Sequence, residues 1–482
     1  MKKRFGTIVA LLLCLTMSCS LALGGCEKTK DPEGENPGIT NPKPEEPETP
    51  DPPQGDTFKV TLRSGYTPEK FEYISNEVTK LADGVHLVAN KIKVSVGTSV
   101  VYTVEVDLEK ANIVAGTKNN VASGFDYTKD TPYNMALAWE KATSGNVYAA
   151  INADFFGSYC VNAFVKDGVI IKDSHNDQGN YDYKNGASDV PASAPMLFGV
   201  KGTTAQVAPI MSVAGDPADP DVKKQLVQAK LTYGLPVGNS VEGLKLDEAP
   251  VGSETSYLTS GSYTVKGWAV KVDTSNVPTS LEVLEVKELK SREKLEAGNG
   301  VAWIVTGSTT NAVAKYFKEL KQGDKLAFSV KSPDGAWDGY ETVLGCRQAL
   351  VINDAVAATI TKENTNGAQD KDIPRTAVGV KNGKVVLFAV ESLFYYANKM
   401  GDKLDKVNDT HGLNLPELAE FAYYYGCSNA ANFDGGGSTH LVVHPEGGEA
   451  KTVVRSADFG TWGLNETRVV MNAFLITSRV GK

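Results

Sequence analysis

The stretch ANFDGGGSTHLVV at residues 431–443 decides how the rest of the chain is interpreted, because it places an acidic residue directly before three glycines and two hydroxyl side chains. Glycine inside a strand or helix costs about 0.5 to 1 kcal/mol relative to alanine. Three in a row therefore indicate either a tight connection between two strands or a place where the backbone approaches a ligand. The first is the commoner use of glycine-rich turns, so the second needs support from elsewhere in the chain.

An earlier segment repeats part of this pattern. Residues 150–157, AINADFFG, and residues 430–437, AANFDGGG, share Ala, Asn, Asp and Gly at the same offsets. Both follow a predicted helix and a short predicted strand. Chance accounts for a match of this size as readily as common origin does. If the match is real, two strand ends deliver Asn152 with Asp154 and Asn432 with Asp434 to a shared cleft.

The N-terminus has the form of a bacterial lipoprotein signal over residues 1–26. A basic start is followed by an apolar run that is too short to span a bilayer, and the segment ends in LALGGC. This pattern predicts cleavage before Cys26 and lipidation of Cys26. Cys19 is the alternative, although Thr-Met-Ser before it fits the signal poorly. We expect the protein to be lipid-anchored in the bacterial cell envelope, on the periplasmic side or the cell surface, with no other membrane attachment.

The composition divides the mature chain into a tether and a folded body. Residues 27–58 are predicted to form a disordered acidic tether, with eight prolines and no aromatic residue up to residue 56. Residues 59–482 have an ordinary globular composition and are predicted to form one large domain, with residues 200–340 as a β-rich insertion or second lobe. The net charge of -9 and the lack of a basic tract argue against nucleic acid as a partner.

Strands outnumber helices in the body and do not alternate with them regularly. We therefore expect an α+β fold with mixed or antiparallel sheets and a few packing helices. Helices are predicted from the cap residue Thr131 to Gly145, from residue 311 to Gly323, and from Asn414 to Gly426. Three sparse cysteines remain after processing and are expected to be buried apolar residues rather than disulfides, namely Cys160, Cys346 and Cys427.

Four segments together resemble the phosphodiester glycosidase family. They are AAINADFFG, IPRTAVGV, GLNLPELAEFAYYYGCSNAANFDGGGSTHLVV and ETRVVMNAFLI, in the order of the family, and the resemblance extends from about residue 75 to residue 477. It implies hydrolysis at the anomeric carbon of a sugar-1-phosphodiester in a glycan. The positions that match the family are Asn152, Asp154, Phe155, Phe156, Arg375, Thr376, Asp434, Gly435, Gly436, Gly437, Ser438 and Arg468.

The chain departs from the family at one place. Many relatives have Asp-Gly-Arg after the strand that matches VVLFAV, whereas this chain has Glu391, Ser392 and Leu393. Glu391 keeps the charge of the family aspartate, but the arginine is missing. This departure supports an alternative function, in which the protein is a surface glycan-binding lipoprotein without turnover.

Two carboxylates are the candidates for the catalytic groups. Asp434 and Asp154 are predicted to be catalytic, because glycosidic cleavage usually pairs an acid with a base or a nucleophile. A phosphomonoester leaves well without protonation, so one carboxylate can suffice. The ordinary alternatives are that Asp434 caps its own turn and that Asp154 ends a strand.

Substrate binding is assigned to groups that suit phosphate and sugar. Backbone N–H groups of Gly435 to Gly437, with Ser438, are predicted to form an anion nest. Arg375 and Arg468 are predicted to bind phosphate, Arg347 is a third candidate, and surface ion pairs are the ordinary alternative for each. Asn152, Thr376 and Asn432 are predicted to support the site or contact the sugar.

No cofactor is expected, although Asp434 is a possible ligand of a divalent cation. None of the five histidines shows metal-ligand spacing. His440 lies next to the glycines and is a candidate for proton transfer. The expected partner is a phosphorylated glycan substrate, and the sequence indicates no protein partner.

Overall fold

The structure is a computed structural model. Residues 1–57, with Cys26 and nearly all of the predicted tether, lie outside the part that it describes, and no helix within that part is long and apolar enough to cross a bilayer. The described residues are 58–120, 129–157, 160–172, 181–182, 196–209, 212–214, 223–226, 232–237, 240–245, 255–256, 261–263, 266–273, 281–291, 293–296, 301–306, 309–310, 312–326, 329–332, 334–358, 360, 371–393, 410–456 and 467–479.

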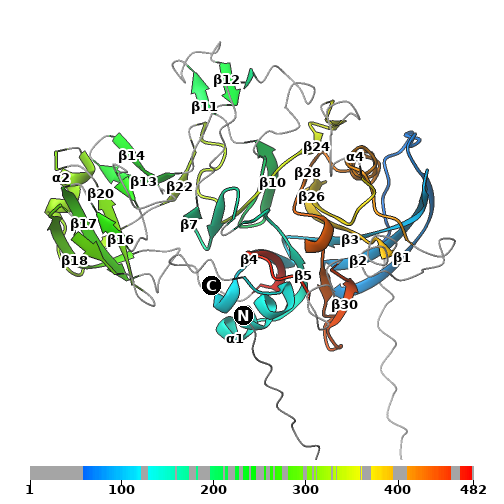
Figure 1. The fold of residues 1–482 in the computed structure, drawn as a ribbon, viewed down its shortest axis with the longest axis horizontal. Coiled ribbons are helices and arrows are strands. Elements are labelled where there is room, and N and C mark those ends of the chain that lie inside the picture. Colours follow the sequence, from blue (N-terminus) through cyan, green and yellow to red (C-terminus); the bar gives the residue numbers. More distant parts are fainter. Residues whose placement is uncertain are drawn as a thin grey trace, which may run out of the picture. The chain divides into compact units, whose positions relative to one another are not determined.

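An eight-stranded antiparallel sheet forms the first layer of the core (Figure 1). Its strands lie in the order β1-β2-β3-β27-β26-β28-β24-β25. The bounds are β1 (Glu72–Ala82), β2 (Val85–Val94), β3 (Gly97–Val106), β24 (Ala349–Ile352), β25 (Ala355–Val356), β26 (Arg375–Lys381), β27 (Lys384–Val390) and β28 (Asn429–Asn432).

Helix α4 (Leu415–Tyr424) begins at the predicted capping box. The Asn414 side chain accepts a hydrogen bond from the backbone N of Glu417 at 2.9 Å, and the Glu417 carboxylate accepts one from the backbone N of Asn414 at 3.1 Å. The helix ends before Gly426, whose φ of 99° is a conformation that favours glycine. The local sequence is therefore sufficient to place this helix.

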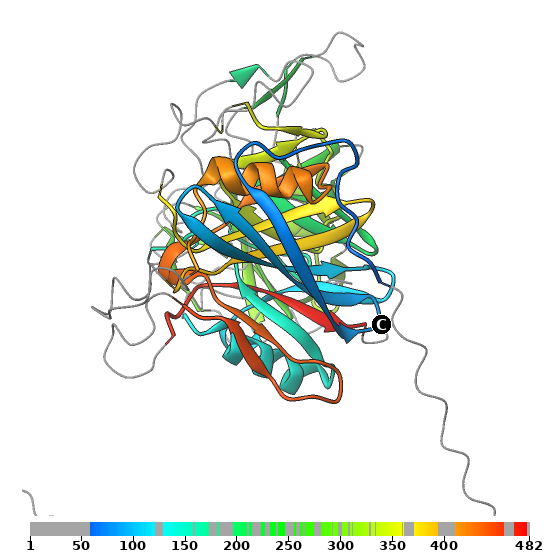
Figure 2. The same cartoon turned by 90° about the vertical axis from the view of Figure 1, so that its right-hand side faces the viewer.

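The central strands are apolar along their length because both faces of the sheet are covered. On one face, Phe388 of β27 lies with its ring centroid 6.2 Å from that of Phe421 and 5.9 Å from that of Tyr425. On the other face, Thr376 of β26 donates a hydrogen bond to Asn152 of a second sheet. Figure 2 shows α4, in orange, lying across the strands of the first sheet.

The second sheet has five strands in the order β30-β29-β5-β31-β4 and carries helix α1. Thr131 caps α1 by accepting a hydrogen bond from the backbone N of Asn134, as predicted. The helix ends at Thr143, and Ser144, whose φ is 59°, is its C-cap in place of the predicted Gly145. The bounds are β4 (Ala111–Gly116), η1 (Lys118–Asn120), α1 (Pro132–Thr143), β5 (Val147–Asn152), β29 (Leu441–Val443), β30 (Lys451–Val454) and β31 (Ala473–Ser478).

A third sheet has the order β10-β9-β23-β6-β7, and its strand β10 lies within the predicted insertion at residues 200–340. Its strands are β6 (Phe164–Lys166), β7 (Val169–Lys172), β9 (Met196–Lys201), β10 (Thr204–Pro209) and β23 (Thr342–Cys346).

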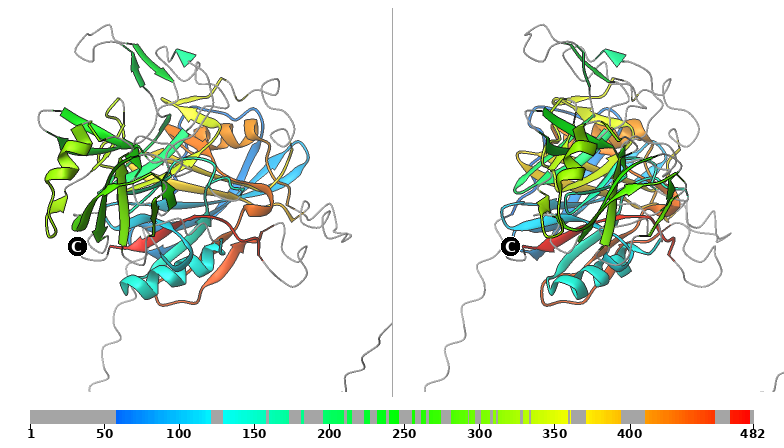
Figure 3. Two further views of the ribbon diagram at one scale, coloured as in Figure 1. Left: turned by 60° about the vertical axis from the view of Figure 1, so that its left-hand side comes forward. Right: turned by 90° about the vertical axis from the view of Figure 1, so that its left-hand side faces the viewer.

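The remaining strands form smaller sheets of their own, several of them seen in green in Figure 3. Helix α2 contacts β17 and β18, and its Phe317 is fully buried in an apolar cluster with Val270 and Val283. The helix ends at Glu319, several residues before the predicted Gly323. The bounds are β8 (Tyr181–Asp182), β11 (Ser212–Ala214), β12 (Lys223–Leu226), β13 (Thr232–Val237), β14 (Ser240–Lys245), β15 (Thr255–Ser256), β16 (Gly261–Tyr263), β17 (Gly267–Asp273), β18 (Leu281–Leu289), β19 (Glu293–Leu295), β20 (Val301–Thr306), α2 (Ala312–Glu319), β21 (Lys325–Leu326) and β22 (Ser329–Lys331).

The predicted fold class is confirmed in its coarser form. The described residues form mostly β-sheet with few helices, so the label α+β is only approximate. The named strands pair in an antiparallel manner throughout the described part, and the three cysteines in it are buried and form no disulfide. The limits of the tether and of the insertion at residues 200–340 stay predictions.

Candidate active site

The triple glycine carries the chain from the first sheet to the second. β28 ends at Asn432, the turn follows with a short 3₁₀ helix, η4 (Gly436–Ser438), and β29 begins at Leu441 in the other sheet. The predicted connection between strands is therefore present. Because it joins two sheets, it also brings residues from both of them together.

Close packing explains why glycine is required in this turn. A Cβ atom on Gly435 would lie 2.8 Å from the carbonyl oxygen of Pro374, and Gly436 has a φ of 59°. The backbone N of Gly436 donates to the same Pro374 oxygen at 2.7 Å. The N–H groups of Ser438 and Thr439 also donate inside the turn. The predicted anion nest is therefore largely filled by acceptors of the protein itself.

Substituting Gly435 with alanine should displace the turn. Its φ of −115° suits any residue, so the contact with Pro374 alone opposes the new Cβ. We expect a loss of about 1 to 3 kcal/mol in unfolding free energy, the usual range for overpacking. Gly157→Ala is the matched control, since nothing lies within 4 Å of its added Cβ. Equal denaturant midpoints for both variants would contradict the packing argument.

Asp434 lies at the start of the turn in a mostly buried but strongly polar environment. Burial raises the pKa of its carboxyl from 3.8 to about 6, against opposing effects of a hydrogen bond from Ser438, the charge of Arg468, a backbone hydrogen bond from Gly435, and the charge of Arg347. Arg468 in turn donates to the Ser438 hydroxyl at 3.2 Å. A carboxyl group whose pKa burial raises to about 6, with two cationic side chains near it, is a candidate functional group.

Asn152 joins the end of β5 to this turn. Its side-chain amide donates to the carbonyl oxygen of Asp434 at 2.6 Å, and its side-chain oxygen accepts from the Thr376 hydroxyl at 2.8 Å and from the backbone N of His440 at 3.2 Å. The backbone N of Asp434 also donates to the Ala153 oxygen at 3.1 Å. The two strand ends with similar sequences are therefore side by side, as expected.

Asp154 does not face the turn as a free carboxylate. It is 1% exposed, and its two oxygens accept hydrogen bonds from the backbone N of Asn162 at 3.0 Å and from the Asn162 side chain at 2.6 Å. Its own N–H donates to the Asn472 side chain at 2.9 Å. This geometry disfavours the predicted catalytic role, because the carboxylate is already committed to Asn162. No sequence signal indicated Asn162, and Asn472 lies in the quoted segment ETRVVMNAFLI.

Thr376 and Asn432 are buried supports of the site. Thr376 is fully buried beneath the turn, with its hydroxyl on Asn152 and 3.3 Å from that of Thr439. Asn432 is 3% exposed and donates to the Gln348 side chain at 2.9 Å, while its side-chain oxygen has no hydrogen-bond partner within the described structure.

The three candidate arginines differ in how many hydrogen bonds the guanidinium already donates to the protein. Arg375 is buried and donates to the backbone oxygens of Leu413 and Lys371, both at 2.8 Å. These bonds connect β26 to the neighbouring loops, so the assignment of Arg375 to phosphate is disfavoured. Arg468 is half-buried and bound to Ser438, and Arg347 is exposed.

The family assignment rests on comparison with known proteins. A model of the phosphodiester glycosidase family matches residues 289–477. Residues 289–477 are therefore similar to the phosphodiester glycosidase family. The match confirms the resemblance found in the sequence and includes Arg375, Asp434 and Arg468. The match begins downstream of residues 150–157, so only the geometry relates Asn152 to the site.

Solved structures give weaker similarities. A hypothetical protein from Synechocystis has 17% identity and a TM-score of 0.49, and the alignment covers 84% of this chain and 64% of that protein. The zebrafish N-acetylglucosamine-1-phosphodiester alpha-N-acetylglucosaminidase catalytic domain, auto-inhibited by its pro-peptide, has 12% identity and a TM-score of 0.38, with 87% of each chain covered. Neither similarity is high enough to carry an argument here. No curated protein matches the sequence.

Within the matched residues 289–477, His440 is held neutral. Its ring is 3% exposed, burial lowers its pKa to about 4, and both ring nitrogens lack a hydrogen-bond partner within the described part of the chain. A ring with this pKa is a weak base and has no proton to donate as an acid at neutral pH, which disfavours the suggested role in proton transfer. The described residues contain no cluster of three or more His, Cys, Asp or Glu side chains able to hold a metal. Independence from metal stays a prediction.

Glu391, which replaces the family aspartate, follows the last residue of β27. Its carboxylate accepts a hydrogen bond from the Thr410 hydroxyl at 3.1 Å, and burial raises its pKa. The positive charge of Arg455 opposes that shift. The neighbouring Ser456 binds the carbonyl oxygen of Gly437. Glu391 therefore interacts with Arg455, whose chain neighbour Ser456 contacts the glycine turn.

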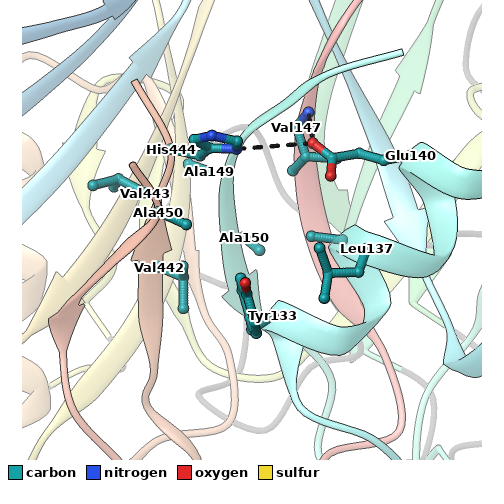
Figure 4. Close-up of a pocket in the computed structure, with 11 residues that line it drawn as sticks. Tyr133, Leu137, Glu140, Val147, Ala149, Ala150, Val442, Val443, His444 and Ala450 are labelled. Carbon is teal, nitrogen blue, oxygen red and sulfur yellow. Dashed lines mark hydrogen bonds and ion pairs between the residues drawn. The ribbon is translucent and has the colours of Figure 1, made fainter. Parts of the chain in front are cut away.

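A separate hollow lies between α1 and the second sheet (Figure 4). Tyr133, Leu137 and Val442 contribute to its mainly apolar lining, and His444 lies 3.9 Å from Glu140 at one end. It contains no predicted site residue.

Proposed function

We propose that the protein is an extracytoplasmic hydrolase that cleaves the glycosidic side of a sugar-1-phosphodiester in a glycan and releases a sugar and a phosphomonoester. The observation that carries this proposal is the Asp434 carboxylate, mostly buried at the junction of two sheets, with the positive charges of Arg468 and Arg347 close enough to lower its pKa. The match of residues 289–477 to the phosphodiester glycosidase family supports a hydrolase acting on such a bond.

The charged side chains divide the reaction between them: the arginines bind the phosphate and Asp434 activates water. The two arginines attract the phosphodiester anion and stabilise the charge that develops on the departing phosphate. Asp434 accepts a proton from water while the water oxygen bonds to the anomeric carbon. The bond from that carbon to the phosphate oxygen breaks, and the electron pair leaves with the phosphate. Asp434 then returns the proton to solvent, so one carboxylate suffices and Asp154 remains a support.

Hydrolysis in oxygen-18 water tests the position of cleavage. Attack at carbon places the label in the released sugar. Label in the released phosphate would show attack at phosphorus and would remove the glycosidase assignment. A panel of sugar-1-phosphodiesters supplies the substrates, and exhaustive chelation during the same assay tests the expected independence from metal.

The pH profile follows from the raised pKa of Asp434. The ionised carboxylate is the active form, so kcat/KM should fall about tenfold per pH unit below about 6 and level off above it. Arg468→Gln removes a charge that lowers this pKa, so its acidic limb should move to higher pH. The measurement is kcat/KM from about pH 4 to about pH 8. A profile that declines above pH 6 instead would make Asp434 a general acid.

A glycan-binding protein without turnover is the second candidate, because Glu391, Ser392 and Leu393 replace the family's Asp-Gly-Arg. Its signature is affinity for a phosphorylated glycan, no product after prolonged incubation, and no effect of Asp434→Ala on binding. Any turnover that Asp434→Ala abolishes excludes it.

The cellular location is part of the same proposal. Cys26 is the proposed lipid attachment site, and the acidic tether holds the enzyme away from the membrane. Cys26→Ser should release the protein from the membrane fraction, whereas Cys19→Ser should not. The reverse result would move the anchor to Cys19.

A further inference from the structure

Arg347 lies beside the candidate site and belongs to a different segment of the chain than Arg375. It lies between β23 and β24, and its backbone N donates to the carbonyl oxygen of Asn432 at 3.0 Å. Asn432 is two residues before Asp434, so the backbone of Arg347 is fixed next to the strand that delivers the carboxylate. The positive charge of Arg347 accordingly contributes to lowering the pKa of Asp434.

The guanidinium of Arg347 rests on an aromatic ring. Its central carbon lies 5.2 Å from the ring centroid of Phe155, within the range of a cation–π contact. Phe155 directly follows Asp154, whose carboxylate is fixed by Asn162. The position of Phe155 is therefore fixed through its chain neighbour Asp154. Because no protein acceptor binds the guanidinium within the described residues, its N–H groups are available for a ligand.

Exposure and hydrogen bonding separate Arg347 from the predicted phosphate ligand Arg375. The Arg347 side chain is exposed, and within the described residues its guanidinium has no hydrogen bond or ion pair to a protein acceptor. Arg375 is buried and donates to two backbone oxygens. A fixed, exposed guanidinium with unused donors is suited to bidentate recognition of an anion.

We propose that Arg347, held on Phe155, binds the non-bridging oxygens of the phosphodiester together with Arg468, in the role that the sequence pattern assigned to Arg375. This inference rests on the proposed function and deepens it by identifying the side chains that bind the phosphate. Phe155 acts as a positioning residue that restricts the guanidinium. The other interpretation of the same contact is a surface cation–π pair with no ligand.

Dimethyl phosphate is a suitable probe, because it carries the phosphodiester charge without a sugar and is not a glycosidase substrate. We expect Arg347→Ala to weaken its binding about 10- to 100-fold, as for loss of a charge-assisted hydrogen-bonded pair. Arg347→Lys keeps the charge but not the forked guanidinium, so its affinity for the probe should lie between those of the wild type and Arg347→Ala. Phe155→Leu should weaken binding about threefold. NMR titration at fixed low salt measures each dissociation constant.

Two controls make the result decisive. Arg63 also lies over an aromatic ring, 3.9 Å from the centroid of Tyr423, but on the side of α4, so Arg63→Ala should bind the probe as the wild type does. A carboxyl NMR titration of Asp434 should show a raised pKa in Arg347→Ala and an unchanged one in Arg63→Ala. A purely structural Arg347 would move neither the affinity for the probe nor the pKa of Asp434.

The outcomes also separate this inference from the proposed function. Probe affinity that Arg347→Ala leaves unchanged overturns the inference, even if the enzyme hydrolyses sugar-1-phosphodiesters. A wild-type protein without affinity for dimethyl phosphate overturns it as well. Binding that depends on Arg347, in a protein without turnover on the substrate panel, supports the inference and removes the hydrolase assignment.

Discussion

Asp434→Asn is expected to lower kcat by about a thousandfold while making the folded protein more stable at neutral pH. The loss of activity follows because the amide cannot accept the proton of the attacking water. The gain in stability follows from the pKa of Asp434, which rises from 3.8 to about 6 on folding. The stabilisation that this group supplies is complete below about pH 4 and is lost as the pH rises through about 6.

The size of the effect can be bounded. A shift of about two pKa units corresponds to at most about 3 kcal/mol, and partial exposure together with the lost hydrogen bonds from Ser438 and Gly435 reduces the gain to about 1 kcal/mol. Thermal unfolding at about pH 4 and about pH 8 measures it, since the substitution should be neutral at the lower pH.

Asp154→Asn is the matched control for Asp434→Asn. Both oxygens of Asp154 accept hydrogen bonds from Asn162, so an amide there places a donor against a donor and should destabilise the protein at neutral pH. A stabilised Asp154→Asn together with a destabilised Asp434→Asn would reverse the roles given to the two carboxyl groups.

Asn152→Leu is expected to have the largest effect on stability, with a loss of about 3 kcal/mol or more in unfolding free energy. Three groups lose their partner, namely the Asp434 carbonyl oxygen, the Thr376 hydroxyl and the backbone N of His440. Each buried group left unsatisfied costs about 1 to 3 kcal/mol. Because these bonds hold the turn, the substitution should also lower kcat. Denaturant unfolding and steady-state kinetics on the same preparation measure both effects.

Asn90→Leu separates the two effects of Asn152→Leu. Asn90 is fully buried and donates to the Val101 oxygen at 3.0 Å, while accepting from the Tyr73 hydroxyl at 2.9 Å. It lies in β2, between β1 and β3, so its loss should reduce stability to a similar degree without changing kcat of the folded fraction. An equal drop in kcat for both variants would show that Asn152 acts on activity only through stability.

The site itself was predictable in part. The acid before the glycines was visible in the sequence, and the geometry agrees with its importance because Asp434 combines burial with two cationic neighbours. Asp154 and Arg375 carry the same residue types that the chemistry requires, yet their donors and acceptors are occupied by Asn162 and by backbone oxygens. Sequence gives the chemical type of a side chain, whereas the neighbours that compete for it come from elsewhere in the chain.

The sequence by itself determined the features that depend on residues close together along the chain. The capping box of α4, the N-cap of α1 at Thr131, the apolar strand β27 and the glycines of the turn each arise from contacts or conformations within a few residues. Only the tertiary structure decided which polar groups meet. Asn152 binds Asp434 across 282 positions, and this pairing, like the unused guanidinium of Arg347, exists only because the two sheets pack at the glycine turn.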